Sequence, residues 1–191
     1  MELKNKTILF LGSSVTYGSA AGGVSFVDII QSTLGCRCIK EAVSGTTLAD
    51  ISARSYLSRL RAMENPGQVD LFVCQLSTND ATRKIEIGKT EAAIRCILEH
   101  VEGTFHCPIV FYTGTRFDSP EYEQLIALLY ELQAEYAFEI LDLFYDEGMT
   151  RVDREAYARY MKDPIHPTLL GYTEWWTPKF LEFFERLTPG V

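Results

Sequence analysis

The 191-residue chain contains no long hydrophobic run and no cluster of basic residues. A membrane-spanning helix needs about 20 consecutive apolar residues, so the sequence predicts no stable association with a membrane. The net charge is −8 and the sequence pI is about 4.9. Without a cluster of basic residues to neutralise phosphates, nucleic acid is not an expected partner.

Patterns typical of disulfides, metal sites and secretion are also missing. The five cysteines have no C-x-x-C spacing and no paired histidine ligands: Cys36, Cys38, Cys74, Cys96 and Cys107. An odd number of cysteines without such spacing is typical of a reduced, intracellular protein. The first apolar run, residues 8–11, is shorter than the core of a signal peptide, and no A-x-A cleavage pattern follows. We therefore expect a cytoplasmic protein.

Length and composition are those of one globular domain. The sequence is 47% hydrophobic and 23% charged, which is near the globular average. A chain of this length can bury a large core without a disulfide or a metal ion to hold it together. No internal repeat or low-complexity segment divides the sequence, and we expect residues 1–191 to form a single domain.

Short apolar runs alternate with amphipathic segments along the chain. Strands are expected at 7–12, 36–43, 69–77, 107–114 and 138–144. Helices are expected at 25–35, 48–64, 89–102, 119–136 and 168–187, with a short helix around 153–160 and a bend near Pro178. This alternation predicts an α/β fold, a three-layer αβα sandwich around a five-stranded parallel sheet. We predict the flavodoxin-like strand order 2-1-3-4-5.

Polar segments follow the first three predicted strands. They are "GSSVTYG" (12–18), "SGTT" (44–47) and "STND" (77–80). In parallel sheets, ligands bind beyond the carboxyl ends of the strands, at the point where the strand order reverses. The sequence therefore predicts a functional site at this edge.

The residue types needed for a serine nucleophile are present. Ser14 lies where the first strand turns into the next element, and a serine hydroxyl needs an adjacent base. Of the three histidines, His100 falls in a helix and His106 precedes the fourth strand, whereas His166 lies in the irregular segment "DPIH". Asp163, three residues before His166, can accept a hydrogen bond from imidazole Nδ1 and leave Nε2 facing Ser14.

Donors for an oxyanion can also be named. Gly45 has no Cβ, so its backbone N–H can approach a ligand closely. Asn79 offers a side-chain NH₂ group, and the backbone N–H of Ser14 is the third candidate. Fixed donors of this kind stabilise the tetrahedral intermediate of acyl transfer.

These segments resemble, in order, the four blocks of the SGNH (GDSL-type) hydrolase family. "GSSVTYG" resembles Gly-Asp-Ser-x-x-x-Gly, "SGTT" resembles the second block, "STND" resembles Gly-x-Asn-Asp and "DPIH" resembles Asp-x-x-His. Two positions differ, because Ser13 replaces the family's Asp and Ser77 replaces its Gly. The spacing to Gly18 favours Ser14 over Ser13 as the nucleophile. The resemblance spans residues 12–167 and implies the three-layer fold, hydrolysis of esters and thioesters, and no cofactor.

We therefore predict a serine hydrolase acting on a small-molecule carboxylic ester, such as an acetyl ester of a carbohydrate. Ser14, Asp163 and His166 form its predicted triad, and Ser14, Gly45 and Asn79 its predicted oxyanion donors. No cofactor and no metal ion is predicted, and the sequence gives no prediction of the oligomeric state.

Two other functions stay open. The same fold binds flavin mononucleotide in flavodoxins, and "SSVTYGS" can cradle a phosphate with backbone N–H groups. A flavin spectrum in the purified protein would favour this alternative. The other is a non-catalytic module that binds carbohydrate or lipid, which would show no turnover of any short-chain ester. A P-loop is not expected because the sequence contains no complete G-x-x-x-x-G-K-[S/T] motif.

Overall fold

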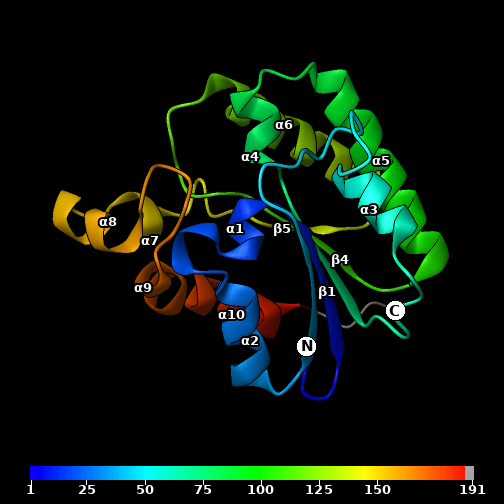
Figure 1. The fold of residues 1–191 in the computed structure, drawn as a ribbon, viewed down its shortest axis with the longest axis horizontal. Helices are drawn as coiled ribbons and strands as arrows, with labels where there is room; N and C mark the ends of the chain where they lie inside the picture. The colour runs from blue at the N-terminus through cyan, green and yellow to red at the C-terminus, as the bar shows by residue number, and fades with distance from the viewer. Residues whose placement is uncertain (188–191) are drawn as a thin grey trace.

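The structure, a computed structural model, describes residues 1–187. Five parallel strands form one sheet in the order β2-β1-β3-β4-β5, with helices on both faces (Figure 1). The strands are β1 (Thr7–Gly12), β2 (Arg37–Ala42), β3 (Leu71–Gln75), β4 (Ile109–Tyr112) and β5 (Glu139–Leu141). The predicted fold class and strand order are confirmed.

Helices follow every strand. They are α1 (Ser14–Tyr17), η1 (Ser19–Ala21), α2 (Phe26–Leu34), α3 (Tyr56–Ala62), α4 (Thr78–Thr82), α5 (Ile87–Thr104), α6 (Pro120–Gln133), α7 (Glu147–Thr150), α8 (Arg154–Tyr160), α9 (Leu169–Gly171), η2 (Tyr172–Trp176) and α10 (Thr177–Arg186). None of the helices within residues 1–187 is long and apolar enough to cross a membrane.

The sheet is buried on both faces. Helices α3, α5 and α6 cover one face, and α2, η2 and α10 cover the other (Figure 1). Successive side chains of a strand point to opposite faces, so Leu9 and Leu11 of β1 join the first core while Ile8 and Phe10 join the second. Burial on both faces explains why the central strands are continuous apolar runs. The same packing fixes the positions of the strand ends, which the residues of the candidate site follow.

Capping residues mark several helix ends where the sequence predicted them. Ser25 caps α2 together with Asp28, and Gly35 ends that helix in the left-handed conformation with φ of 64°. Ser119 caps α6, and Pro120 occupies its first turn, where the missing N–H costs nothing.

The helix predicted at 48–64 is shorter than expected, since α3 begins only at Tyr56. The backbone N–H groups of Leu48 and Ala49 donate to the Asp80 carboxylate, at 2.8 and 2.7 Å. Ser55 then caps α3 by accepting a hydrogen bond from a backbone N–H. Residues 48–55 therefore form a loop at the carboxyl edge of the sheet.

The predicted closing helix at 168–187 is divided into three parts. A π-helical turn, η2, separates α9 from α10, and Pro178 lies in the first turn of α10. The π turn brings buried Trp176 to the ring of Phe26, 6.0 Å away between centroids, and Phe180 stacks on Phe26 at 4.2 Å. Aromatic packing thus fixes η2 and α10 against α2.

Residues 146–162 contain two short helices, α7 and α8. The predicted short helix around 153–160 corresponds to α8. Figure 1 shows α7 and α8 to one side of the sheet, projecting from the body of the molecule at the left of the view.

Candidate active site

A tight turn carries Ser14 at the carboxyl end of β1. Gly12 is the last residue of β1, Ser13 occupies the N-cap position of α1, and Ser14 is the first residue of α1. A Cβ on Gly12 would lie 1.8 Å from Thr16 Oγ1, so the strand and the helix pack too closely for any other residue. Gly18 ends α1 with φ of 90°. Glycine at both ends allows the chain to turn sharply and raise Ser14 at the rim of the sheet.

The two adjacent serines point to different surroundings. The Ser13 side chain is fully buried, and its N–H and Oγ donate to Gln75 Oε1 at 2.9 and 3.3 Å. Ser14 Oγ instead lies 2.8 Å from Nε2 of His166. Ser13 therefore holds the turn against β3, and only Ser14 contacts the histidine.

Further buried hydrogen bonds hold α1 on the sheet. Thr16 Oγ1 donates to the same Gln75 Oε1 at 2.9 Å and lies 2.6 Å from the Tyr112 hydroxyl. Gln75 and Tyr112 are the last residues of β3 and β4. The ends of these two strands thus fix the position of the turn that carries Ser14.

The loop between α8 and α9 carries His166 and Asp163. Asp163 Oδ1 accepts hydrogen bonds from the backbone N–H groups of Ile165 and His166, both at 2.8 Å. His166 Nδ1 lies 2.8 Å from Oδ2 and 3.0 Å from Oδ1 of the same carboxylate. One carboxylate therefore folds the loop and orients the imidazole.

The surroundings of Asp163 favour its ionised form. Partial burial opposes ionisation, but the two backbone N–H donors and the imidazole outweigh it and hold the pKa of the Asp163 carboxyl below its ordinary value. A carboxylate that stays ionised keeps the proton on Nδ1 and leaves the Nε2 lone pair toward Ser14.

The His166 loop is tied to α8, and η2, which follows the loop and α9, is tied to α1. Thr168 N–H donates to Tyr160 O at 2.8 Å, and the buried Tyr172 hydroxyl donates to Val15 O at 2.7 Å. Gly171 packs so closely that a Cβ would lie 2.0 Å from Tyr160 O. Elements about 150 residues apart in the sequence are thus held together by buried contacts.

The other two candidate oxyanion donors lie in the loop after β2 and in α4. Gly45, with φ of 76°, is exposed in the loop after β2. Asn79 lies in α4, and its Nδ2 donates to Thr46 O at 2.8 Å, which leaves the second amide hydrogen for another acceptor. Ser77 caps α4, with its Oγ 3.3 Å from the N–H of Asp80. Ser77, which replaces the glycine of the family pattern, thus caps a helix.

Two residues that the sequence analysis did not select hold the Gly45 loop. Buried Asp80 accepts from the backbone of Leu48 and Ala49 and from Thr90 Oγ1 at 2.9 Å. Arg83 Nη2 donates to Gly45 O at 2.7 Å. The "STND" segment places Asp80 next to Asn79, but spacing alone does not reveal which backbone groups it binds. Asn79, Asp80 and Arg83 together fasten the loop to α4.

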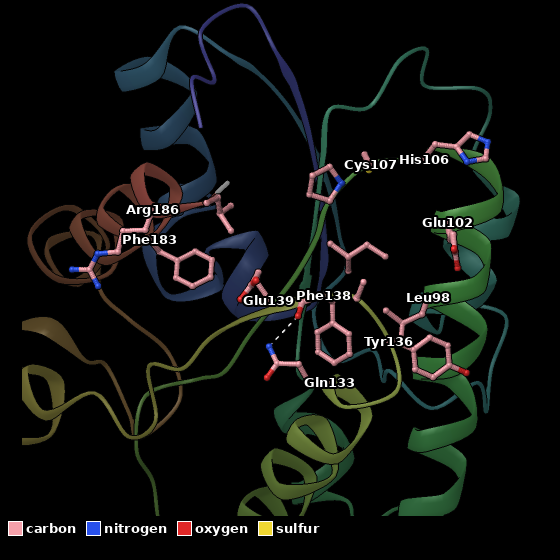
Figure 2. Close-up of a pocket in the computed structure, with 14 residues that line it drawn as sticks. Leu98, Glu102, His106, Cys107, Gln133, Tyr136, Phe138, Glu139, Phe183 and Arg186 are labelled. Carbon is pink, nitrogen blue, oxygen red and sulfur yellow. Dashed lines mark hydrogen bonds between the residues drawn. The ribbon is translucent and has the colours of Figure 1, made fainter. Parts of the chain in front are cut away.

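A large cavity lies away from this site. Its volume is about 850 Å³, and its walls include His106 and Cys107 before β4, Glu139 of β5, and Phe183 and Arg186 of α10. These residues surround the amino ends of the strands (Figure 2), whereas Ser14 follows the carboxyl end of β1. Within residues 1–187, no group of three or more His, Cys, Asp or Glu side chains can hold a metal ion.

Comparison with known protein families shows which family the chain belongs to. The model of the GDSL-like lipase/acylhydrolase family matches residues 10–173, which include Ser14, Asn79 and His166. The chain belongs to this family. Membership confirms the predicted resemblance and supports the prediction of a carboxylic ester hydrolase. A search of curated proteins gives no match.

Solved structures share the fold over nearly the whole chain. A Lactobacillus plantarum protein is 21% identical with a TM-score of 0.81, covering 97% of this chain and 99% of its own. An acetylxylan esterase from Geobacillus stearothermophilus is 18% identical with a TM-score of 0.72, covering 95% of both chains. A putative lipolytic protein of the G-D-S-L family from Desulfitobacterium hafniense is 14% identical with a TM-score of 0.75, covering 93% of this chain and 99% of its own.

Proposed function

We propose that this protein hydrolyses small carboxylic esters through a Ser14-His166-Asp163 triad. The observation that carries the proposal is the chain of contacts from Ser14 Oγ to His166 Nε2, at 2.8 Å, and from Nδ1 to Asp163, at 2.8 Å. A base within hydrogen-bond distance of the nucleophile, itself oriented by a third group, is the arrangement that acyl transfer requires.

The reaction proceeds in two halves. His166 accepts the proton of Ser14 as Oγ attacks the ester carbonyl, and the negative oxygen of the tetrahedral intermediate accepts hydrogen bonds from the N–H groups of Ser14 and Gly45 and from the Asn79 amide. The imidazolium then donates its proton to the leaving alcohol, and an acyl group remains on Ser14. Water, deprotonated by His166, attacks this acyl group and releases the acid.

The first N–H of a helix has no acceptor within the helix. The Ser14 N–H begins α1 in this way, so it is suited to donate to the oxyanion. Loss of one such donor costs about 10²–10³ in rate in well-studied hydrolases. Asp163, kept ionised by its surroundings, stabilises the imidazolium that forms during each half-reaction.

Short acyl groups are the proposed substrates, with acetyl esters of carbohydrates first among them. The cavity that adjoins Gly45 is small, about 180 Å³, and serine and threonine residues are among those that line it. It does not form the long apolar groove that a long acyl chain needs, so acetyl and other short acyl groups are favoured. The acetylxylan esterase among the similar structures supports the same substrate class.

The test is hydrolysis of p-nitrophenyl acetate by the wild type and by Ser14→Ala and Ser13→Ala. Ser14→Ala is expected to lower kcat by roughly 10⁴-fold or more, whereas Ser13→Ala keeps most of the activity. Full activity in Ser14→Ala would refute the assignment, and no turnover by the wild type would favour a non-catalytic binding module. Esters from acetyl to decanoyl then measure the preferred chain length, with acetyl expected to give the highest kcat/KM.

A further inference from the structure

A small cavity beside Gly45 contains two arginine side chains. Its walls are the loop 44–47, Ile51 and Ser52, together with Arg54 and Arg83, and its volume is about 180 Å³. Because Gly45 is also a proposed oxyanion donor, the cavity adjoins one element of the proposed active site. No carboxylate side chain is among the residues that line it.

The charges of both arginines are uncompensated. Within residues 1–187, neither Arg54 nor Arg83 lies within 4.0 Å of a carboxylate oxygen, whereas Arg95 and Arg59 are paired with glutamates. Arg83 uses one N–H to hold Gly45 O, and a guanidinium has five. Two unpaired guanidinium groups create a local positive potential in a protein whose net charge is −8.

The two threonine hydroxyl groups of the cavity are already engaged as donors. Thr46 Oγ1 donates to Val43 O at 2.7 Å, and Thr47 Oγ1 donates to Ala49 O at 2.9 Å. The two guanidinium groups are therefore the main source of donors for a bound molecule. The Ile51 side chain, 50% exposed at the rim, offers an apolar contact for the carbon skeleton.

We propose that this cavity binds an anionic group, a carboxylate or a phosphate, carried by the ester substrate. Guanidinium groups bind these anions through paired, charge-assisted hydrogen bonds. The inference rests on the proposed function, because it assigns the substrate class of the same site: esters with a negative charge close to the scissile bond. The unpaired positive charge also attracts such esters from solution, against the repulsion of the acidic remainder of the surface.

The kinetic experiment compares 4-acetoxybenzoate, which is anionic, with its neutral methyl ester. The measured quantity is the ratio of the two kcat/KM values in the wild type and in Arg54→Gln. Arg54 is chosen because Arg83 also holds the Gly45 carbonyl. The ratio is expected to fall about tenfold in Arg54→Gln and to fall in the wild type as ionic strength rises. Arg61→Gln, an exposed arginine outside the cavity, is the matched control and should leave the ratio unchanged.

A binding measurement separates this inference from the proposed function. Isothermal titration calorimetry compares 4-acetamidobenzoate with acetanilide, two non-ester analogues that differ by the carboxylate. Tighter binding of the anion, weakened in Arg54→Gln, supports the cavity even if no ester is hydrolysed. Equal binding of the two analogues, or hydrolysis of both esters with a ratio that Arg54→Gln does not change, would overturn the anionic subsite and leave the esterase proposal intact.

Discussion

Replacing Asp80 by Asn tests how the loop beside the nucleophile is held. The Asp80 side chain is 1% exposed and accepts from two backbone N–H groups and one hydroxyl, all within 2.9 Å. Asparagine keeps the shape but turns one acceptor into an NH₂ group facing a backbone N–H. At least one charge-assisted hydrogen bond is then lost, at about 1.5–3 kcal/mol, and its donor is left buried without a partner, at about 1–3 kcal/mol.

We expect a total loss of about 2.5–6 kcal/mol in the free energy of unfolding, measured by urea denaturation followed by circular dichroism. The same change should lower kcat for p-nitrophenyl acetate by roughly 10- to 100-fold, because Gly45 shifts when its loop is released. Asp118→Asn, an exposed aspartate, is the matched control and should change stability by less than about 0.5 kcal/mol. A loss below about 1 kcal/mol in Asp80→Asn would refute the account of the loop.

Three further changes test the turn and the histidine loop. Thr16→Val removes a buried hydroxyl that bonds to Tyr112 and should cost about 1–3 kcal/mol in urea unfolding, whereas exposed Thr104→Val should cost little. Gly18→Ala adds a Cβ 2.3 Å from a backbone carbonyl at φ of +90°. The free energy of unfolding should fall by about 2–4 kcal/mol, and an unchanged unfolding midpoint would contradict this crowding. Asp163→Asn removes a carboxyl whose folded pKa is lowered; its contribution to stability is present above the unfolded pKa of about 3.9 and disappears as pH falls through the folded pKa. The difference in Tm between wild type and Asp163→Asn should therefore shrink from about pH 6 to pH 3, and a constant difference would argue against the lowered pKa.

Sequence patterns predicted the sheet because they depend on local chemistry. The central strands are buried on both faces and read as apolar runs, and Ser25, Gly35 and Ser119-Pro120 mark helix ends through capping that acts within a few residues. The segment 48–55 was mispredicted as helix because its amphipathic pattern is overridden by a contact with Asp80, 31 residues or more away in the chain. A contact between residues so far apart in the chain leaves no periodic pattern in the sequence.

The residues of the candidate site were likewise predicted only in part. Ser14, Gly45, Asn79, Asp163 and His166 follow strand ends or occupy an irregular turn, so their residue types and order were visible in the sequence. The partners of Ser13, Asp80 and Arg83 were not, because each is chosen by packing across elements. Ser13 illustrates the difference: its neighbour in the sequence contacts His166, while its own hydroxyl points to Gln75 on β3.

The proposed function depends most directly on Ser14 being the nucleophile. Reaction with diethyl p-nitrophenyl phosphate, followed by peptide mapping in a mass spectrometer, tests it directly, since this reagent phosphorylates a serine activated by a base. We predict one diethylphosphoryl group per chain, on Ser14, and no labelling in His166→Ala. A label on Ser13, or an unlabelled wild-type protein, would contradict it.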